Sequence, residues 1–202
     1  MTTDGGSVKA HRVCPWWLGY LLASPIRKIW QDPARILAPY VREGQRVLEP
    51  GPGMGFFTLE LARLVGPQGR VYAVDLQAKM IDTLKRRAAR AGLGDRIEAR
   101  VASADSLAIT DLQGTIDFVL AFAMVHEMPD GGKFFREAAS ATKPGGRLLL
   151  AEPEGHVKDA MFEGEVKLAV SAGFELTDRP RIGHSLAALL TLSKPHHSGD
   201  CS

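Results

Sequence analysis

Residues 47–62 read VLEPGPGMGFFTLELA, and this stretch decides the fold. Its first part is an apolar run typical of a buried strand, and its last part has the apolar spacing of a helix. Three glycines, Gly51, Gly53 and Gly55, lie between the two. Glycines at a strand-to-helix turn let backbone N–H groups come close to a ligand, and the start of a helix favours an anionic group. The stretch therefore predicts a ligand-binding loop at the edge of a parallel sheet.

The spacing of these glycines distinguishes the loop from two common phosphate-binding motifs. A dinucleotide fingerprint, GxGxxG, would place its third glycine at position 56, which is Phe56. A P-loop requires a lysine after its last glycine, and Gly55 is followed by phenylalanine. The loop is GxGxG, which weakens both interpretations.

A second acidic position supports a nucleoside ligand. The run RVYAVD at 70–75 predicts a strand that ends at Asp75, 24 residues after Gly51. A carboxylate at the end of this strand lies where two hydrogen bonds can hold the diol of a ribose. Asp75 also disfavours a 2′-phosphate at that position, and hence NADP.

The chain from residue 46 onward alternates short strand-like runs with helical segments, which is typical of a mainly parallel sheet. Most of the strand runs are apolar at their centres, as in strands covered on both faces. We expect an α/β fold with a Rossmann-like, doubly wound, mostly parallel seven-stranded sheet, a closing antiparallel β-hairpin and an N-terminal helical lid. Strands are expected at 46–50, 70–75, 96–102, 116–122, 146–153, 174–179 and 185–192, with a helix near 157–172.

A further helix is expected between the second and third strands. Ile81, Leu84, Ala88 and Ala91 recur at helical spacing, and Gly92 supplies a stop. The other positions carry five basic residues, which could bind RNA or phosphate but are more simply a solvated outer face. We assign no function to this basic set, which consists of Lys79, Lys85, Arg86, Arg87 and Arg90.

The first forty residues differ in character from the rest. All three tryptophans, Trp16, Trp17 and Trp30, lie there, and side chains of this size require an apolar cover. Ser24 and Asp32 each precede a proline, the pattern of an N-cap followed by the first helical residue. The segment either forms a lid over the ligand or completes the core. We predict an aromatic helical lid over 1–40, a ligand-binding domain over 41–192 and a disordered tail over 193–202.

Composition limits the partners of the chain. Of its 202 residues, 45% are hydrophobic and 24% are charged, which is ordinary for a globular protein, and the net charge of +2 gives no argument for a nucleic-acid partner. Cys14 and Cys201 form no CxxC pair, so neither a zinc site nor a disulfide framework is indicated. No apolar run approaches the roughly 18 residues that span a bilayer. We expect a cytoplasmic monomer or homodimer without a membrane or nucleic-acid partner.

Taken together, these motifs resemble the class I S-adenosylmethionine-dependent methyltransferases. In that family an acidic residue precedes GxGxG, and a second acidic residue ends the second strand. The stretches VLEPGPGMGFFT, VDLQAKMI and TKPGGRLLLAE are most similar to the small-molecule branch that includes quinone and arsenite methyltransferases. Arsenite enzymes depend on several cysteines. Because Cys14 is the one cysteine outside the tail, we exclude that acceptor.

The resemblance, which covers about residues 35–192, implies where S-adenosylmethionine binds. The loop from Glu49 to Gly55 would hold its methionine part, Asp75 its ribose, and Leu76 and Met80 would flank its adenine. The residue near the adenine amine stays open, because the register after the third strand is ambiguous. The expected cofactor-binding set is Glu49, Gly51, Gly53, Gly55, Asp75, Leu76, Met80, Ser103, Ala104, Asp105 and Ala121, and no metal is expected.

A candidate base follows the fourth strand. His126 and Glu127 lie in AFAMVHEMPD, at the edge of the sheet where open α/β folds bind ligands. A histidine can accept a proton from a hydroxyl or amine nucleophile near neutral pH. A structural histidine or a helix cap is an equal alternative. The role is also optional, because in-line positioning can supply most of the acceleration of methyl transfer.

Two further polar groups are expected near the same edge. Glu152, Glu154 and His156 follow the fifth strand and could hold a metal, although ordinary loop polarity is the simpler interpretation. Arg179, Arg181 and His184 surround the closing turn, where they either clamp an acidic substrate or form a solvated hairpin tip.

The sequence thus favours an S-adenosylmethionine-dependent methyltransferase acting on a small, partly apolar acceptor. Two alternatives remain open at this point. An NAD-dependent oxidoreductase shares the order of strand, glycine loop and acid but is opposed by the glycine spacing. A non-catalytic S-adenosylmethionine-binding protein would need the same cofactor site and no acceptor site.

Overall fold

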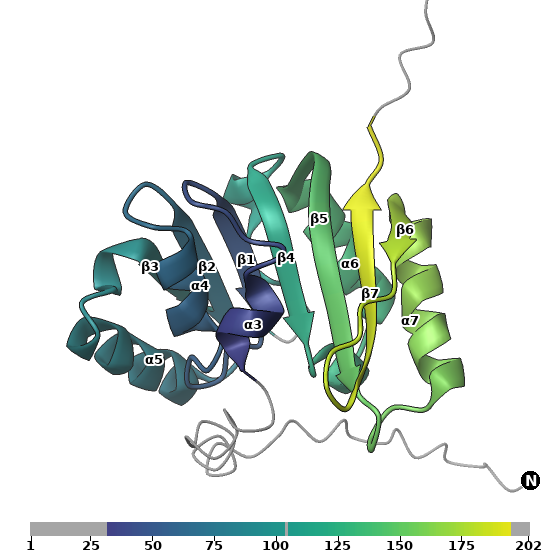
Figure 1. Cartoon of the computed structure of the whole chain (residues 1–202), viewed down its shortest axis with the longest axis horizontal. Coiled ribbons are helices and arrows are strands. Elements are labelled where there is room, and N and C mark those ends of the chain that lie inside the picture. Colours follow the sequence, from purple (N-terminus) through teal and green to yellow (C-terminus); the bar gives the residue numbers. More distant parts are fainter. Residues whose placement is uncertain (1–31, 104, 195–202) are drawn as a thin grey trace, which may run out of the picture.

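A seven-stranded sheet forms the centre of the computed structural model, which describes residues 32–103 and 105–194 (Figure 1). The strand order is β3-β2-β1-β4-β5-β7-β6. β7 pairs antiparallel with β5 and β6, and the other neighbours pair in parallel. The predicted doubly wound, mostly parallel sheet with a closing hairpin is confirmed. The strands are β1 (Arg46–Pro50), β2 (Arg70–Asp75), β3 (Ile97–Val101), β4 (Ile116–Phe122), β5 (Thr142–Pro153), β6 (Phe174–Asp178) and β7 (Ser185–Leu192).

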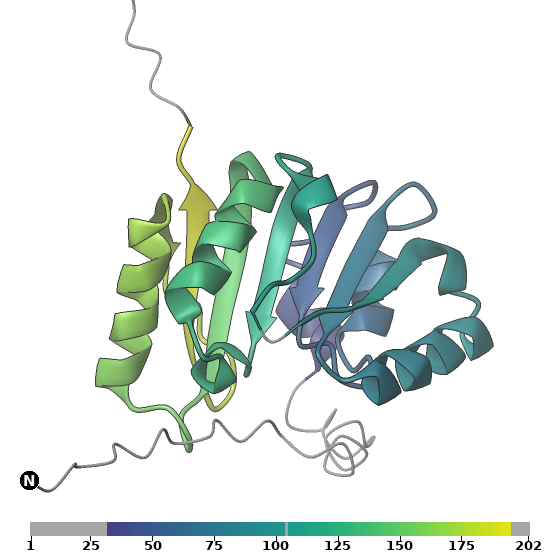
Figure 2. The ribbon, with the colours of Figure 1, turned by 180° about the vertical axis from the view of Figure 1, so that it is seen from behind.

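Helices cover both faces of this sheet. α6 and α7 lie behind the sheet in Figure 1 and in front of it in Figure 2, whereas α3 and α4 lie on the opposite face. Along the described part of the chain, no helix is both long and apolar enough to cross a membrane. The helices are α3 (Pro33–Leu37), α4 (Thr58–Leu64), α5 (Ala78–Arg90), α6 (Gly131–Ala141) and α7 (Asp159–Ser171), with short 3-10 turns η1 (Gly94–Arg96), η2 (Thr110–Leu112) and η3 (Val125–Glu127).

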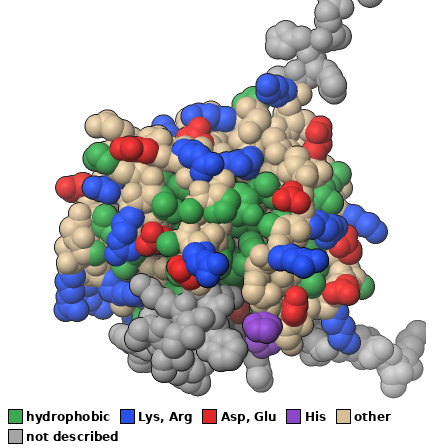
Figure 3. All heavy atoms as spheres, viewed as in Figure 1, with side chains coloured by type: hydrophobic (Ala, Val, Ile, Leu, Met, Phe, Trp, Pro, Cys, Tyr) green, Lys and Arg blue, Asp and Glu red, His purple; other side chains and the backbone are tan. Residues whose placement is uncertain are grey.

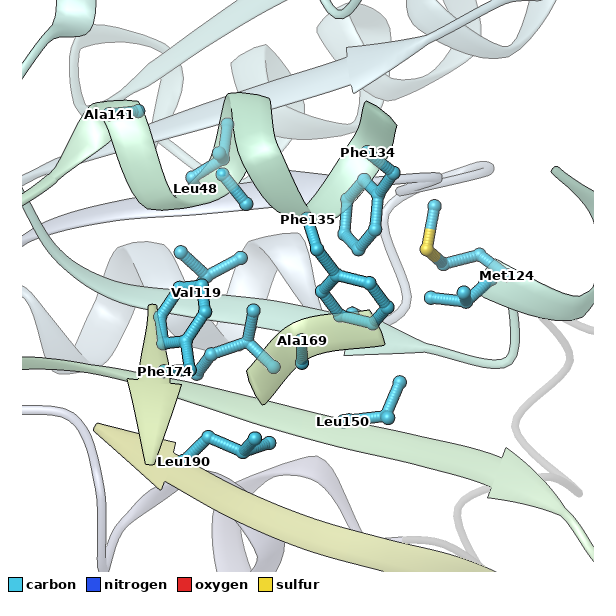
Figure 4. Packing of buried hydrophobic residues seen from close by; sticks show 14 of the residues in the cluster. Leu48, Val119, Met124, Phe134, Phe135, Ala141, Leu150, Ala169, Phe174 and Leu190 are labelled. Carbon is cyan, nitrogen blue, oxygen red and sulfur yellow. The ribbon is translucent and has the colours of Figure 1, made fainter. Parts of the chain in front are cut away.

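Two apolar clusters, one on each face, form the core. In the cluster under α6 and α7, Phe134 and Phe135 of α6 lie near Leu150 of β5 (Figure 4). The second cluster joins α3 and α4 to the other face of β1, β4, β5 and β7, and hydrophobic side chains gather over the middle of that face (Figure 3). Burial on both faces explains why the central strands are apolar at their centres.

Three strands differ from the sequence expectation, one of them, β6, only by ending at Asp178 rather than at residue 179. The third strand, expected at 96–102, spans Ile97–Val101, and its side chains are half-buried or exposed because β3 is an edge strand. The fifth begins earlier, at Thr142, and its pairing with β4 jumps from Ile116–Thr142 to Phe118–Arg147. The residues between these pairs form an irregularity in the pairing of β4 with β5. Hydrophobic periodicity in the sequence does not indicate such an irregularity.

The described start of the chain packs on the sheet. As predicted, Asp32 caps α3 by accepting a hydrogen bond from the backbone N–H of Ala34 at 3.0 Å, with Pro33 in the first turn. Leu37 is fully buried, and the Tyr40 ring stacks on Phe118 with 6.1 Å between centroids. The predicted cap at Ser24, the aromatic positions Trp16, Trp17 and Trp30, and residues 195–202 of the predicted tail lie outside the described residues.

The core position of Phe118 gives a stability prediction. Phe118 is fully buried in the middle of β4. Phe118→Ala should lower the free energy of unfolding by about 3–5 kcal/mol, because it removes a large side chain and leaves a cavity. Leu176→Ala on edge strand β6, where the side chain is 40% exposed, should cost about 1 kcal/mol or less. Equal midpoints of the two variants in urea unfolding would contradict this assignment of the core.

Candidate active site

The candidate site lies where the strand order of the sheet reverses. β1 pairs with β2 on one side and with β4 on the other. In open α/β sheets a ligand binds in the crevice outside the carboxyl ends of such strands. The loops after β1, β2 and β4 all leave the sheet at this edge, the lower one in Figure 1.

Glu49 is a buried carboxyl group at this edge. It lies next to the last residue of β1 and is 3% exposed. Its Oε2 atom has no hydrogen-bond partner in the described structure. Burial raises the pKa of Glu49 to about 8. An acid in this state can ionise when a cationic group comes to lie against it.

The glycine loop combines one open position with one crowded position. Gly53 has φ +54°, and a Cβ built there meets no atom within 4 Å. Gly55 has φ +85°, and its Cβ would lie 2.5 Å from Cδ1 of Leu84 in α5. Gly53 thus borders free space that a ligand can fill, whereas Gly55 lets the loop pack on α5. Gly51 lies against the loop after β4, with 3.1 Å from its built Cβ to Cβ of Met124.

Asp75 links the second strand to the glycine loop. Its Oδ2 accepts the N–H of Gly53 at 3.2 Å, and its Oδ1 accepts the N–H of Gln77 at 2.9 Å. Burial raises the pKa of Asp75, and the nearby carboxylate of Glu127 in η3 raises it further. Asp75 likewise raises the pKa of Glu49, so Asp75 repels the carboxyl groups of both Glu49 and Glu127. Their arrangement favours a ligand with positive charge.

The residues expected near the adenine lie around the ends of β2, β3 and β4. Leu76 is 41% exposed directly after β2, whereas Met80 is buried in the first turn of α5. Ser103 donates its hydroxyl to the carboxylate of Asp105 at 2.7 Å. Ala121 is fully buried in the core, and Ala104 lies outside the described residues. Binding by this set stays a prediction.

His126 is held by Glu152 of β5. The ring Nδ1 lies 2.6 Å from Oε2 of Glu152. The backbone N–H groups of Met124, Val125 and His126 all point at Oε1 of Glu152, at 3.3, 2.8 and 3.4 Å. The hydrogen bond to Glu152 raises the pKa of His126. The His126 side chain is 19% exposed, so a buried carboxylate orients an imidazole that still reaches the surface.

The loop polarity expected for Glu152 is wrong. Glu152 is fully buried at the end of β5, whereas Glu154 and His156 are exposed in the following loop. Among the residues that the structure describes, no group of three His, Cys, Asp or Glu side chains is arranged to hold a metal ion. The fifth-strand acid is instead part of the His126 environment.

The arginines of the closing turn border a separate cavity of about 530 Å³. Arg179 forms an ion pair with Glu163 of α7, with two contacts of 2.8 Å. Arg181 lines the cavity beside buried Ile182, and the backbone carbonyl of His184 accepts the N–H of Glu154 at 3.1 Å. The guanidinium of Arg179 is therefore occupied within the protein, and a clamp formed by this group stays untested.

Sequence reasoning missed one acidic residue of the site, Glu165, and the effect of the charge of another, Glu127. Glu165 of α7 is 6% exposed, and its pKa is raised to about 7 by burial and by the charge of Glu152. Glu127, which was noted beside His126, acts on Asp75 across the crevice. The sequence did contain a signal for Glu152, the residue that holds His126. Glu152 ends the apolar run RLLLAE, and a charged residue in a buried strand needs a partner.

Comparison with known proteins places this geometry in context. Residues 42–182 match the family described as "Methyltransferase domain". The ubiquinone/menaquinone biosynthesis C-methyltransferase UbiE of Hahella chejuensis is 33% identical over 132 residues, which cover 65% of this chain and 52% of that protein. The UbiE protein of Cronobacter sakazakii is 29% identical over 167 residues, or 83% of this chain and 63% of that one. The chain thus spans about half to under two thirds of these relatives.

A solved structure supports the fold. The crystal structure of a SAM dependent methyltransferase from Aquifex aeolicus has a TM-score of 0.80 and 22% sequence identity, covering 89% of this chain and all of that one (100%). At this identity the likeness shows the architecture of the sheet and helices.

The glycine loop gives a prediction that needs no ligand. Gly55→Ala should destabilise the fold by about 2–4 kcal/mol, because the methyl group meets Leu84 and the left-handed backbone disfavours a side chain. Gly53→Ala should cost about 1–2 kcal/mol, since strain alone applies there. Thermal unfolding of both variants checks the order, and a Gly53 variant that is less stable than the Gly55 variant would contradict the assignment of open space to Gly53.

Proposed function

Since the chain belongs to the methyltransferase-domain family, we propose that it transfers a methyl group from S-adenosylmethionine to a small-molecule acceptor. The observation that carries the proposal is Glu49, a buried carboxyl group with an unpartnered oxygen at the mouth of the glycine loop. Burying such a group without a partner costs free energy in the ligand-free protein. A cationic ligand that pairs with the group explains its presence.

The residues of the crevice fit S-adenosylmethionine. Its ammonium group can pair with Glu49, and its ribose hydroxyls can donate to the carboxylate of Asp75. The open space beside Gly53 admits the chain of atoms between them. S-adenosylmethionine carries positive charge on sulfur and on its amino group, which suits the acidic border of Glu49, Asp75 and Glu127. The GxGxG spacing of the loop, which differs from the GxGxxG of dinucleotide-binding folds, argues against the NAD-dependent alternative.

His126 is the proposed base. Bound S-adenosylmethionine supplies an electrophilic methyl group on a sulfonium centre. An acceptor that carries an ionisable proton becomes a better nucleophile when that proton is removed. The partly exposed imidazole of His126, at the end of β4 beside the crevice, lies where it can accept this proton. Burial of the surrounding strand ends limits water at the reacting atoms.

The acceptor class is proposed from the relatives. Their names describe C-methyltransferases of ubiquinone and menaquinone biosynthesis. We propose an aromatic acceptor of the hydroquinone type, whose ring carbon is nucleophilic when a hydroxyl group on the ring is ionised. A cytoplasmic location, and a monomeric or homodimeric state without nucleic-acid or membrane partners, belong to the same proposal.

Turnover tests the function and separates it from simple binding. The purified protein is incubated with methyl-labelled S-adenosylmethionine and a panel of benzoquinones and naphthoquinones with an unsubstituted ring carbon, each in reduced and oxidised form. Label should enter the reduced members. Binding of S-adenosylhomocysteine without transfer to any member would favour the non-catalytic alternative, and absence of binding would refute the cofactor site.

The raised pKa of Glu49 predicts proton release on cofactor binding. With a pKa of about 8, Glu49 is mostly protonated near neutral pH, and pairing with an ammonium group should ionise it. Calorimetry with S-adenosylhomocysteine in buffers of different ionisation enthalpy should therefore show release of most of one proton at about pH 7, fading above about pH 9. Glu49→Gln should remove this release, whereas a wild-type binding heat independent of buffer would contradict the pairing.

The proposed base gives a kinetic prediction. His126→Ala should lower turnover by about 100-fold or more at saturating acceptor, while the dissociation constant of S-adenosylhomocysteine stays near the wild-type value. Unchanged turnover would mean that positioning alone accelerates the reaction. A proportional loss of cofactor binding would instead assign His126 to the cofactor pocket.

A further inference from the structure

We propose that a buried acid acts on the reaction through His126: Glu152 fixes the ring with Nε2 as its proton acceptor. The inference rests on the proposed function, because it concerns the base of that reaction. Glu152 is a positioning residue, since it is fully buried and cannot touch an acceptor.

The surroundings of Glu152 determine which ring nitrogen carries hydrogen. Backbone N–H groups can donate and cannot accept, so Oε1 of Glu152 is an acceptor for the N–H groups of residues 124–126. Its Oε2 faces Nδ1 of His126 at 2.6 Å. With these donors in place the carboxylate accepts the Nδ1–H of the ring. The neutral imidazole then has its lone pair on Nε2, the nitrogen that lies away from Glu152.

The backbone turns sharply at Ala123, between β4 and the contact of His126 with Glu152. Ala123 has φ +54°, a left-handed conformation that is strained for a residue with a side chain. Its N–H donates to the carbonyl of Ala151 at 2.7 Å, the last step of the ladder before the chain turns. The turn directs three successive N–H groups at one oxygen of Glu152, an arrangement that binds anions. Strain of about 1–2 kcal/mol is thus offset by these hydrogen bonds.

Glu165 of α7 is a second buried acid whose charge acts on the same ring. It is 6% exposed, and its Oε2 has no partner in the described structure. Its charge raises the pKa of His126, as do the charges of Glu152 and Glu127, and His126 in turn lowers the pKa of Glu165. Oε1 of Glu127 lies 4.0 Å from Nε2. The groups that act on the ring from β5, η3 and α7 are therefore all acidic, and each favours the imidazolium.

This environment restricts the acceptor to molecules that must lose a proton. The proton leaves a hydroxyl group of the acceptor and bonds to Nε2, and the electron pair of the broken O–H bond stays on the acceptor. In an aromatic acceptor that pair raises the electron density of the ring carbons. His126 becomes an imidazolium that is hydrogen-bonded to Glu152. The network would contribute nothing to an acceptor that carries no ionisable proton.

Imidazole nitrogen NMR of the full chain tests this role without an acceptor. In the wild-type protein at a pH above the pKa of His126, Nδ1 should be protonated and Nε2 unprotonated. Glu152→Gln should reverse this tautomer, because the carboxamide oxygen still accepts the backbone N–H groups while its NH₂ group donates to Nδ1. Glu165→Gln should keep the wild-type tautomer and lower the pKa of His126.

Kinetics and a matched control complete the experiment. Glu152→Gln should reduce turnover of a reduced naphthoquinone by about 100-fold or more, with little change in the affinity for S-adenosylhomocysteine. Glu154→Gln, two residues further and exposed, should leave tautomer, pKa and turnover unchanged. An unprotonated Nδ1 in the wild-type spectrum overturns the role of Glu152 even if no variant folds. This result is independent of whether the proposed acceptors react.

Discussion

The parallel pairing of β1 with β4 at the centre of the sheet is the constraint on which the site depends. The register places Val47 opposite Phe118 and Leu48 opposite Val119, so both strands end at the same edge. Their following loops are thereby forced together, with Gly51 against Met124. Because helices cover both faces of these strands, the loops are held by a rigid core rather than by each other. The positions of Glu49 at the end of β1 and Glu127 after β4 follow from this arrangement.

Acidic groups at the sheet edge lower the stability of the free protein as pH rises. The pKa of Glu49 in the folded chain is about 8, above the value of about 4.3 expected when unfolded. Its contribution to stability is therefore fully present below about pH 4 and is lost as pH rises through about 8. A cationic ligand reverses this effect by stabilising the ionised form. The buried acid thus lowers the stability of the free protein and raises its affinity for a cationic ligand. Functional sites often combine these two effects.

The central strands and the end of α5 could be predicted, because the hydrophobic pattern of the sequence agrees with the burial of the side chains there. β1, β2, β4 and β7 have the expected bounds, and Gly92 follows the end of α5. The edge strand β3 was less regular because one-sided cover weakens the apolar pattern. The network of His126, Glu152 and Glu165 could not be predicted, since the contact between His126 and Glu152 joins residues 26 positions apart. Spacing along the chain carries no information on such a contact when the turn at Ala123 is unknown.

The insertion of β7 between β5 and β6 has a consequence for biosynthesis. Among the described strands, β6 pairs with β7 alone, so it cannot join the sheet when it leaves the ribosome. It must wait for Ser185–Leu192, the last strand of the described chain. Until then the outer side of β5 presents an unpaired edge of apolar residues such as Leu148 and Leu150, a surface open to mispairing. Completion of the sheet therefore waits for the synthesis of β7, and a nascent chain truncated before β7 would expose this edge to other proteins.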